Sequence, residues 1–173
     1  DLISARMPKG GLQHAKVSLL YWSNLVRLII GSANLTEDGY RRNLEVFGVL
    51  DFQLGGDAPV SCLLATVEFL RQTGEFATVG DVPTPPLNRW HGLLDRVVKE
   101  CSQWGASDDL TRRTGVQVRP VFSGPGSKSV FTSLSETWPG GSPPDAGFVV
   151  SPFFDPPEAD NAPARALWNL LRQ

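Results

Sequence analysis

The sequence predicts an α/β fold in which helices pack against a mixed β-sheet. Short apolar runs separated by turn residues fill the first 52 residues, and apolar residues at helical spacing follow between residues 60 and 104. Further on, an apolar run at residues 148–154 precedes a helical pattern, which is how an α/β lobe begins. The 173 residues suffice for one domain with a real core, or for one domain and part of a second.

Two apolar runs near the N-terminus predict a β-hairpin. They cover residues 17–22 and 25–30, and the Ser23-Asn24 pair between them is typical of a turn. Loose alternation of apolar residues predicts a third strand over residues 43–52. Before that strand, Thr36 is a candidate helix cap, and Gly39 argues against a long helix.

The rest of the chain is predicted to be richer in helices. Apolar spacing predicts helices over residues 60–73, 88–104, 127–134 and 162–171, and strands over residues 116–122 and 148–154. Pro120 places the first of these two strands at an edge or an end of the sheet. Proline and glycine between residues 74 and 88 are typical of a linker. We therefore predict one lobe over residues 1–78, and a helix-rich connection with the start of a second α/β lobe over residues 79–173.

Composition narrows the function classes. The net charge of −2 provides no global positive field for nucleic acid, although Arg41 and Arg42 leave a local basic site open. Cys62 and Cys101 lie in apolar helical patterns and form no C-x-x-C motif, so we predict buried free thiols, which fits a cytoplasmic location. No apolar run is long enough to span a membrane, and the first residues do not form a signal peptide. We expect no stable membrane insertion.

Polar residues gather at the open end of the predicted hairpin. His14 and Lys16 are two residues apart, so their side chains project from the same face of a strand. The second strand runs into the sequence Gly-Ser-Ala-Asn at residues 31–34. Because strand pairing brings the two ends of the hairpin together, we expect His14 and Lys16 to lie close to Ser32 and Asn34. The glycine beside them lets another group approach the backbone closely.

These residue types suit phosphoryl transfer. A neutral imidazole attacks phosphorus and forms a phosphohistidine, which divides one difficult displacement into two easier ones. Lys16 and Asn34 are candidates to hold the non-bridging oxygens, with Ser32 as a further hydrogen-bond donor. Glu45, which follows Asn43 by two residues, is a candidate to accept a proton from the far ring nitrogen of a histidine and fix its tautomer. Lys16 and the amides supply the electrostatics, so the chemistry requires no metal or other cofactor.

The pattern H-x-K at residues 14–16, followed by G-S-x-N at residues 31–34 and N-x-E at residues 43–45, resembles the phospholipase D superfamily. The familiar motif has an aspartate where this sequence has Tyr21. Because it lacks that aspartate, the motif here resembles the motif of the tyrosyl-DNA phosphodiesterase branch. Ser133-Leu134 and residues 138–143 are similar to another segment of that branch. The resemblance implies a phospholipase D-like fold, a metal-independent phosphodiesterase with a phosphohistidine intermediate, and a nucleic-acid 3′ phosphodiester as substrate, as in DNA repair.

One such motif makes half of a site. The resembled mechanism needs a second histidine that protonates the leaving group, and loss of a general acid costs about 10² to 10⁴ in rate. His91 is the only other histidine, and its place among Trp90 and Leu93 on a predicted helix favours a structural role. Since the chain begins at Asp1 and reaches the motif almost at once, we expect a fragment of a longer protein. The second motif is then expected in a missing C-terminal lobe or in a second copy of the chain.

Two other interpretations are open at the level of sequence. One is a phospholipid phosphodiesterase or transferase, which an amphipathic helix with one basic face would favour. The other is a catalytically silent half-site that binds phosphodiesters within a larger DNA-processing protein. A phosphohistidine trapped on His14 would exclude the silent half-site.

Overall fold

The computed structural model describes residue 3 and residues 5–76, 85–104, 116–138, 145–151 and 160–171. The chain forms two compact units, Asp1–Pro120 and Val121–Gln173. The linker-like residues 77–84, where the sequence predicted a division between lobes, lie outside the described residues.

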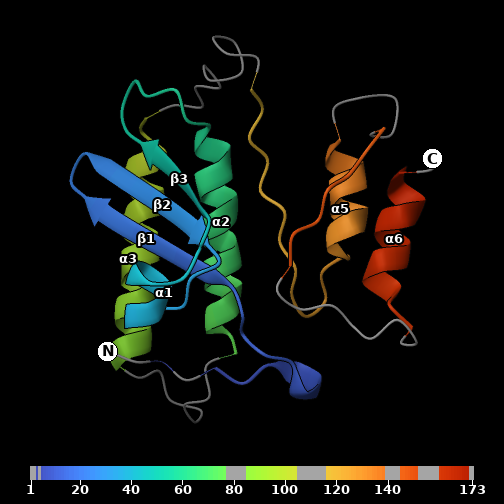
Figure 1. Ribbon diagram of the computed structural model, residues 1–173. Helices are drawn as coiled ribbons and strands as arrows, with labels where there is room; N and C mark the ends of the chain where they lie inside the picture. Colours follow the sequence, from blue (N-terminus) through green and yellow to red (C-terminus); the bar gives the residue numbers. More distant parts are fainter. Residues whose placement is uncertain are drawn as a thin grey trace. The chain divides into compact units, whose positions relative to one another are not determined.

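A three-stranded antiparallel sheet organises the first unit. Its strands are β1 (Lys16–Trp22), β2 (Leu25–Gly31) and β3 (Phe47–Phe52), in the order β1-β2-β3 (Figure 1). The predicted hairpin is confirmed, with a turn at residues 23 and 24. The third strand begins four residues later than predicted, because residues 43–46 form a connection rather than part of the ladder.

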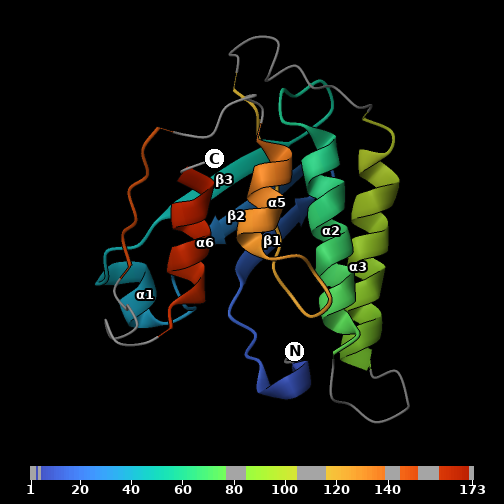
Figure 2. The same ribbon diagram turned by 90° about the vertical axis from the view of Figure 1, so that its right-hand side faces the viewer.

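Helices of the first unit cover one face of this sheet. They are α2 (Val60–Gly74) and α3 (Pro85–Cys101), which lie side by side behind the strands in Figure 1 and beside each other in Figure 2. Both were predicted, and α3 begins three residues earlier than expected. Because α3 packs against α2, residues on both sides of the predicted boundary at residues 78 and 79 share one core. The short helix α1 (Glu37–Arg41) and a 3₁₀ turn, η1 (Pro8–Gly10), complete this unit.

The core lies between the sheet and the two helices. Alternate residues of the strands face the helices, since successive side chains of a strand point to opposite faces. The fully buried members are Val26, Leu28 and Phe52 of the sheet, Leu63 and Val67 of α2, and Leu94, Val97 and Cys101 of α3. Both cysteines are buried and free, as predicted. Val26 and Leu28 anchor β2 in this core, and β2 leads directly into the residues of the predicted site.

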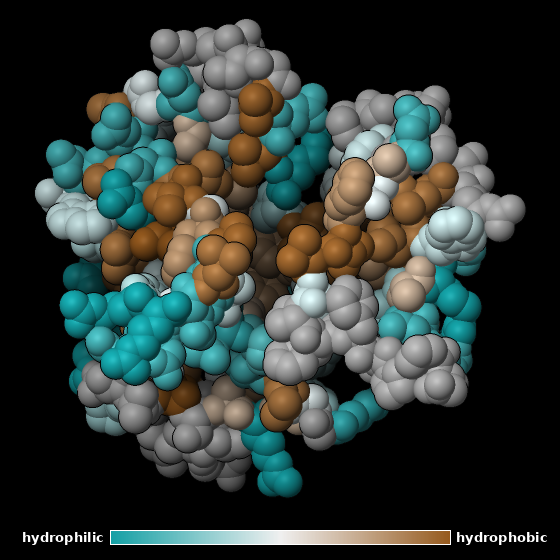
Figure 3. All heavy atoms as spheres, in the orientation of Figure 1, coloured by the Kyte–Doolittle hydropathy of each residue, from teal (hydrophilic) through white to brown (hydrophobic). Residues whose placement is uncertain are grey.

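The other face of the sheet carries exposed apolar side chains. Leu20, Trp22, Phe47 and Val49 are each more than two-fifths exposed, and Figure 3 shows apolar side chains gathered over the strands on this side. Arg27 and Asp51 form an ion pair among them, with two contacts of 2.7 Å between guanidinium and carboxylate. The two residues lie directly opposite each other in the β2–β3 ladder, so the pair marks the register of the strands.

This ion pair predicts a pH dependence. The hydrogen bonds from Arg27 hold the pKa of the Asp51 carboxyl below its ordinary value of 3.8. Since the folded-state pKa lies below that of the unfolded chain, the pair stabilises the fold above about pH 4, and the contribution disappears as pH falls through the lowered pKa. NMR titration of the Asp51 carboxyl carbon should give a midpoint below 3.8, and Arg27→Gln should raise it. An unchanged midpoint in Arg27→Gln would contradict the assignment.

The second unit contains two helices, α5 (Val130–Thr137) and α6 (Ala162–Leu171). The bounds of α6 are those predicted. The helix α5 begins three residues later than predicted, because Ser129 caps it and its hydroxyl accepts a hydrogen bond from the backbone N–H of Thr132 at 3.1 Å. Residues 139–143 of the similarity noted in the sequence lie outside the described residues.

The predictions of strands over residues 116–122 and 148–154 are wrong for the residues that the structure describes. Residues 116–122 and residues 148–151 have no regular secondary structure, and residues 152–154 lie outside the described part. Pro120 lacks the backbone N–H that a ladder needs, and Phe148 and Val150 are 98% and 100% exposed, so this apolar run has no buried face. The α/β class is confirmed, but within the described residues the sheet is antiparallel rather than mixed. None of the described helices combines the length and apolar character needed to cross a membrane.

Candidate functional site

The strand register places the two halves of the predicted motif at one end of the sheet. Lys16, the first residue of β1, is paired with Gly31, the last residue of β2, and Gly31 is paired on its other side with Phe47. His14 precedes this row by two residues, and Ser32 follows it by one. Both are exposed at the open end of the hairpin. The ladder therefore brings the two ends of the hairpin together, as the sequence predicted.

His14 and Lys16 contact each other directly. The Lys16 ammonium lies 3.0 Å from Nδ1 and 3.2 Å from Nε2 of His14, and it also donates to the His14 carbonyl oxygen at 3.0 Å. An ammonium is only a donor, so its hydrogen bond to the ring requires a nitrogen without a proton. Lys16 forms no ion pair with a carboxylate among the described residues. Its positive charge is thus available to an anion that approaches the imidazole.

Ser32, Asn43 and Glu45 form a second group. The Ser32 hydroxyl donates to Oε2 of Glu45 and accepts a hydrogen bond from the backbone N–H of Val46 at 3.2 Å. Asn43 donates to the other carboxylate oxygen of Glu45 at 3.4 Å. The Ser32 proton, which the sequence assigned to a phosphate oxygen, is thus given to Glu45. These contacts fasten the end of β2 to the connection before β3 and fix the direction of the carboxylate.

Asn34 is held by its backbone and leaves its side chain exposed. Its carbonyl oxygen accepts a hydrogen bond from the Thr36 N–H at 2.8 Å. The Thr36 hydroxyl in turn accepts from the Gly39 N–H at 3.1 Å and caps α1, as the sequence predicted. No described residue forms a hydrogen bond with the Asn34 carboxamide. The amide is therefore free to bind a ligand from a fixed backbone.

Gly39 of α1 packs tightly against Asn34, so we expect even a small substitution at Gly39 to lower the stability of the fold strongly. Gly39 is buried, and a Cβ atom at this position would lie 2.3 Å from the Asn34 carbonyl oxygen. Gly39→Ala is expected to destabilise the fold by about 1–3 kcal/mol through overpacking and to displace Asn34. Gly92 is the matched control, because it is exposed on α3 with open space around it.

In chemical denaturation we expect Gly92→Ala to raise the free energy of unfolding by about 0.5–1 kcal/mol, since alanine favours a helix more than glycine does. Equal stability of the Gly39→Ala variant and the original chain would show that α1 is not packed on Asn34 in this way.

Hydrogen bonds do not join the two groups of the site within the described residues. His14 bonds with Lys16, and Ser32 bonds with Glu45, whereas no hydrogen bond connects His14 with Ser32, Asn34 or Glu45. Both carboxylate oxygens of Glu45 accept hydrogen bonds from Ser32 and Asn43, and neither bonds with His14. The role of Glu45 in orienting a histidine therefore stays a prediction.

The basic residues after the motif are neutralised. Arg41 pairs with Glu37 at 3.0 Å, and Arg42 pairs with Asp38 at 3.1 Å, each with the acidic partner four residues earlier on the chain. The four side chains together carry no net charge, so acidic neighbours offset the local basic site that the sequence left open. Lys16 is the cation that lies within the motif itself.

His91 has surroundings typical of a structural residue. It is half-buried on α3, and its Nε2 atom would lie 3.5 Å from a Cβ atom at Gly74, the last residue of α2. The adjacent Trp90 packs against the same glycine and borders the core. This placement agrees with the structural role that the sequence favoured for His91.

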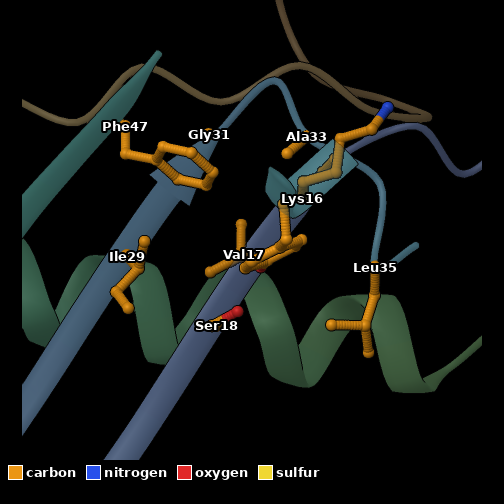
Figure 4. Close-up of a pocket in the computed structure, with 10 residues that line it drawn as sticks. Lys16, Val17, Ser18, Ile29, Gly31, Ala33, Leu35 and Phe47 are labelled. Atoms are coloured by element: carbon orange, nitrogen blue, oxygen red, sulfur yellow. The ribbon is translucent and has the colours of Figure 1, made fainter. Parts of the chain in front are cut away.

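A cavity beside Lys16 was not anticipated from the sequence. Its volume is about 250 Å³, and its lining is shown in Figure 4. It is formed by Ala15, Lys16, Val17, Ser18, Ile29, Gly31, Ala33, Leu35, Tyr40 and Phe47. The strand alternation alone could have shown that Lys16, Gly31 and Phe47 share a face. The contribution of Leu35 and Tyr40 depends on how α1 folds back, which has no sequence signal.

Metal ligands do not cluster in the described part of the chain, where no three His, Cys, Asp or Glu side chains are placed to bind one ion. Comparison with known proteins adds no assignment: no protein-family model, no curated protein and no solved structure matches this chain. The function must therefore be argued from the site itself.

Proposed function

We propose that this chain carries one half of the active site of a metal-independent phosphodiesterase with a phospholipase D-like fold, acting on a nucleic-acid phosphodiester. The observation that supports the proposal is the register of the hairpin. The pairing of Lys16 with Gly31 brings the strand end that follows His14 next to the strand end that precedes Ser32 and Asn34, which supports a shared site for these residues. This residue set provides a nucleophile and charge stabilisation for phosphoryl transfer.

The reaction proceeds in two displacements. An unprotonated ring nitrogen of His14 attacks phosphorus, and the P–O bond to the leaving group breaks. The leaving oxygen takes the electron pair and receives a proton from a second histidine. Lys16 and Asn34 bind the non-bridging oxygens, where negative charge develops. Water then attacks phosphorus, the P–N bond breaks, and His14 regains its electron pair while the second histidine accepts the proton of the water.

Glu45 and its neighbours act as supports in this proposal. The Ser32 and Asn43 hydrogen bonds hold the carboxylate at the end of β2. From this position the carboxylate holds the end of β2, which leads to Asn34, against the connection before β3. Ser32 then acts through Glu45 rather than on the phosphate.

The second histidine comes from another motif of the same kind. The sequence contains two histidines, and His91 lies half-buried on α3 beside the core. We propose that the general acid belongs either to a further lobe of the same protein or to a second copy of the chain. The dependence of turnover on protein concentration distinguishes the two, because a site shared by two copies gains activity as the copies associate.

The test is hydrolysis of bis(nitrophenyl) phosphate in the presence of a chelator. Its weakly basic leaving group departs without protonation, so a half-site lacking the general acid still performs the first displacement. We expect chelator-resistant release of nitrophenolate by the original chain and at least a ~10³-fold slower release by His14→Ala, since the nucleophile is lost. His91→Ala serves as the control and should retain the release.

Release that His14→Ala retains, or release that the chelator abolishes, would contradict the proposal. If the chain binds the diester without releasing nitrophenolate, the silent half-site is the correct interpretation and the catalytic one is wrong.

A further inference from the structure

The first turn of α1 encloses the backbone of Asn34. The Thr36 N–H donates to the Asn34 carbonyl oxygen at 2.8 Å, and the Thr36 hydroxyl accepts from the Gly39 N–H at 3.1 Å. A Cβ atom at Gly39 would lie 2.3 Å from the Asn34 carbonyl oxygen and 3.2 Å from the Asn34 nitrogen. Thr36 therefore serves both sides of this junction, since its N–H holds Asn34 and its hydroxyl holds the turn that packs on Asn34.

The other end of α1 is joined to β3. Tyr40 of α1 and Phe47 of β3 form a tilted ring pair, with 5.8 Å between the centroids and 54° between the planes. Such ring pairs are favourable beyond the area that they bury. Phe47 is paired with Gly31, which is paired with Lys16, and Figure 4 shows the Phe47 ring beside Gly31. The ring contact therefore connects α1 to the row of the sheet that carries Lys16.

The loop before Asn34 is fixed at both of its residues. Ser32 exchanges hydrogen bonds with Val46, and Ala33 is 3% exposed. The direction of Asn34 then depends on rotation about the backbone bonds next to it. Because Thr36 bonds with the carbonyl oxygen of Asn34, α1 restricts this rotation and with it the direction of the side chain.

We propose that Thr36 and Tyr40 are positioning residues, which hold α1 in place and so direct the Asn34 carboxamide toward a phosphate oxygen beside Lys16. Neither residue touches the substrate in this account, and both act through Asn34. The inference rests on the proposed function, since it concerns a phosphate-binding group of the same site. Donors stabilise a transition state when they are already in place, and a misplacement of about 1 Å costs up to about 10²-fold in rate.

Thr36→Val and Thr36→Ser test the role of the hydroxyl. Valine has nearly the shape of threonine but lacks the oxygen that accepts from the Gly39 N–H, whereas serine keeps it. We expect Thr36→Val to slow the first, rapid release of nitrophenolate (the burst) about tenfold at saturating bis(nitrophenyl) phosphate. The half-saturating concentration should change less, and Thr36→Ser should restore the rate. Equal rates for Thr36→Val and the original chain would overturn the proposal.

Coupling to Asn34 separates positioning from a loss of stability. Asn34→Ala should itself slow the burst by about 10² to 10³-fold, because one charge-stabilising donor is lost. If Thr36 acts through Asn34, adding Thr36→Val to Asn34→Ala should slow the burst no further. A general loss of stability would instead multiply the two effects in the double variant, and that result would overturn the proposal.

Thr73→Val is the matched control, because the Thr73 hydroxyl donates to the Phe69 carbonyl oxygen within α2 rather than to the motif. We expect this variant to keep the burst rate. Tyr40→Phe keeps the ring that contacts Phe47 and should also keep the rate, whereas Tyr40→Ala should slow the burst as Thr36→Val does. Equal rates for Tyr40→Phe and Tyr40→Ala would overturn the role of the ring contact.

A binding measurement keeps this inference distinct from the proposed function. NMR titration with dimethyl phosphate, followed through the side-chain amide signals of Asn34, requires no turnover. We expect these signals to shift in the original chain and in Thr36→Ser, with an affinity about threefold lower in Thr36→Val. An absent burst contradicts catalysis alone. Asn34 signals that stay fixed in the original chain, or that respond equally in Thr36→Val, overturn the positioning.

Discussion

Replacing Lys16 with alanine is expected to slow nitrophenolate release by about 10² to 10³-fold, the usual effect of removing one donor that stabilises transition-state charge. The Lys16 ammonium contacts both ring nitrogens of His14 and has no acidic partner among the described residues. Its charge is therefore not already neutralised before the substrate binds. The loss should appear in the rate constant of the nitrophenolate burst at saturating bis(nitrophenyl) phosphate, with a smaller change in the concentration that half-saturates this rate.

Lys99 provides the control for net charge, because it is exposed on α3 and Lys99→Ala removes the same charge away from the motif. We expect this variant to retain the rate of the original chain. Lys16→Arg should recover part of the rate, since guanidinium keeps the charge but binds oxygen in a planar geometry. Equal rates for Lys16→Ala and Lys99→Ala would show that Lys16 does not stabilise the transition state.

Leu28→Ala is expected to have the largest effect on stability. Leu28 lies at the centre of β2, is 1% exposed and belongs to the core between the sheet and the helices. Removing its branched side chain leaves a cavity and should lower the free energy of unfolding by about 2–5 kcal/mol, measured by chemical denaturation. Because β2 leads into Gly31 and Ser32, the same variant should also slow the release of nitrophenolate.

Leu20→Ala is the comparison for this core substitution. Leu20 lies on the neighbouring strand, but it is 41% exposed on the face of the sheet opposite the helices. We expect a cost below about 1 kcal/mol, since much of the side chain is already in contact with water. A cost for Leu20→Ala equal to that for Leu28→Ala would contradict the assignment of the core to the face that α2 and α3 cover.

The hairpin and the first long helix could be predicted because the residues that specify each of them lie close together in the sequence. Two apolar runs around Ser23-Asn24 specify a hairpin, and apolar spacing in residues 60–73 specifies a helix without reference to the rest of the chain. The approach of Lys16 to Gly31 then follows from antiparallel pairing alone. Half of the candidate site could therefore be placed from the sequence.

The predicted strands at residues 116–122 and 148–154 show where this reasoning fails. A short apolar run forms a strand only if another strand pairs with it and a core covers it, and neither condition is visible in the run itself. Val150 is fully exposed in the structure, so its apolar character reflects no buried face among the described residues. The prediction of a mixed sheet depended on these runs, and it is wrong for the part described.

The details of the site depend on contacts between distant residues. Glu45 was predicted to orient a histidine, but the structure places its carboxylate on Ser32 and Asn43. That contact arises because Val46 exchanges hydrogen bonds with Ser32 just outside the β2–β3 ladder. A shift of the third strand by one residue would move Val46 away from Ser32 and break this contact. Sequence spacing alone could not determine this register.

The central claim is that His14 becomes covalently bonded to phosphorus, and one experiment tests it directly. The chain is mixed with bis(nitrophenyl) phosphate in a chelator, stopped with base, since phosphohistidine is preserved in alkali, and digested for mass spectrometry. We predict a rapid burst of about one nitrophenolate per chain and a nitrophenyl phosphoryl group on the peptide that contains His14. A chain that shows neither the burst nor the modified peptide, or a modified peptide that persists in His14→Ala, would contradict the account.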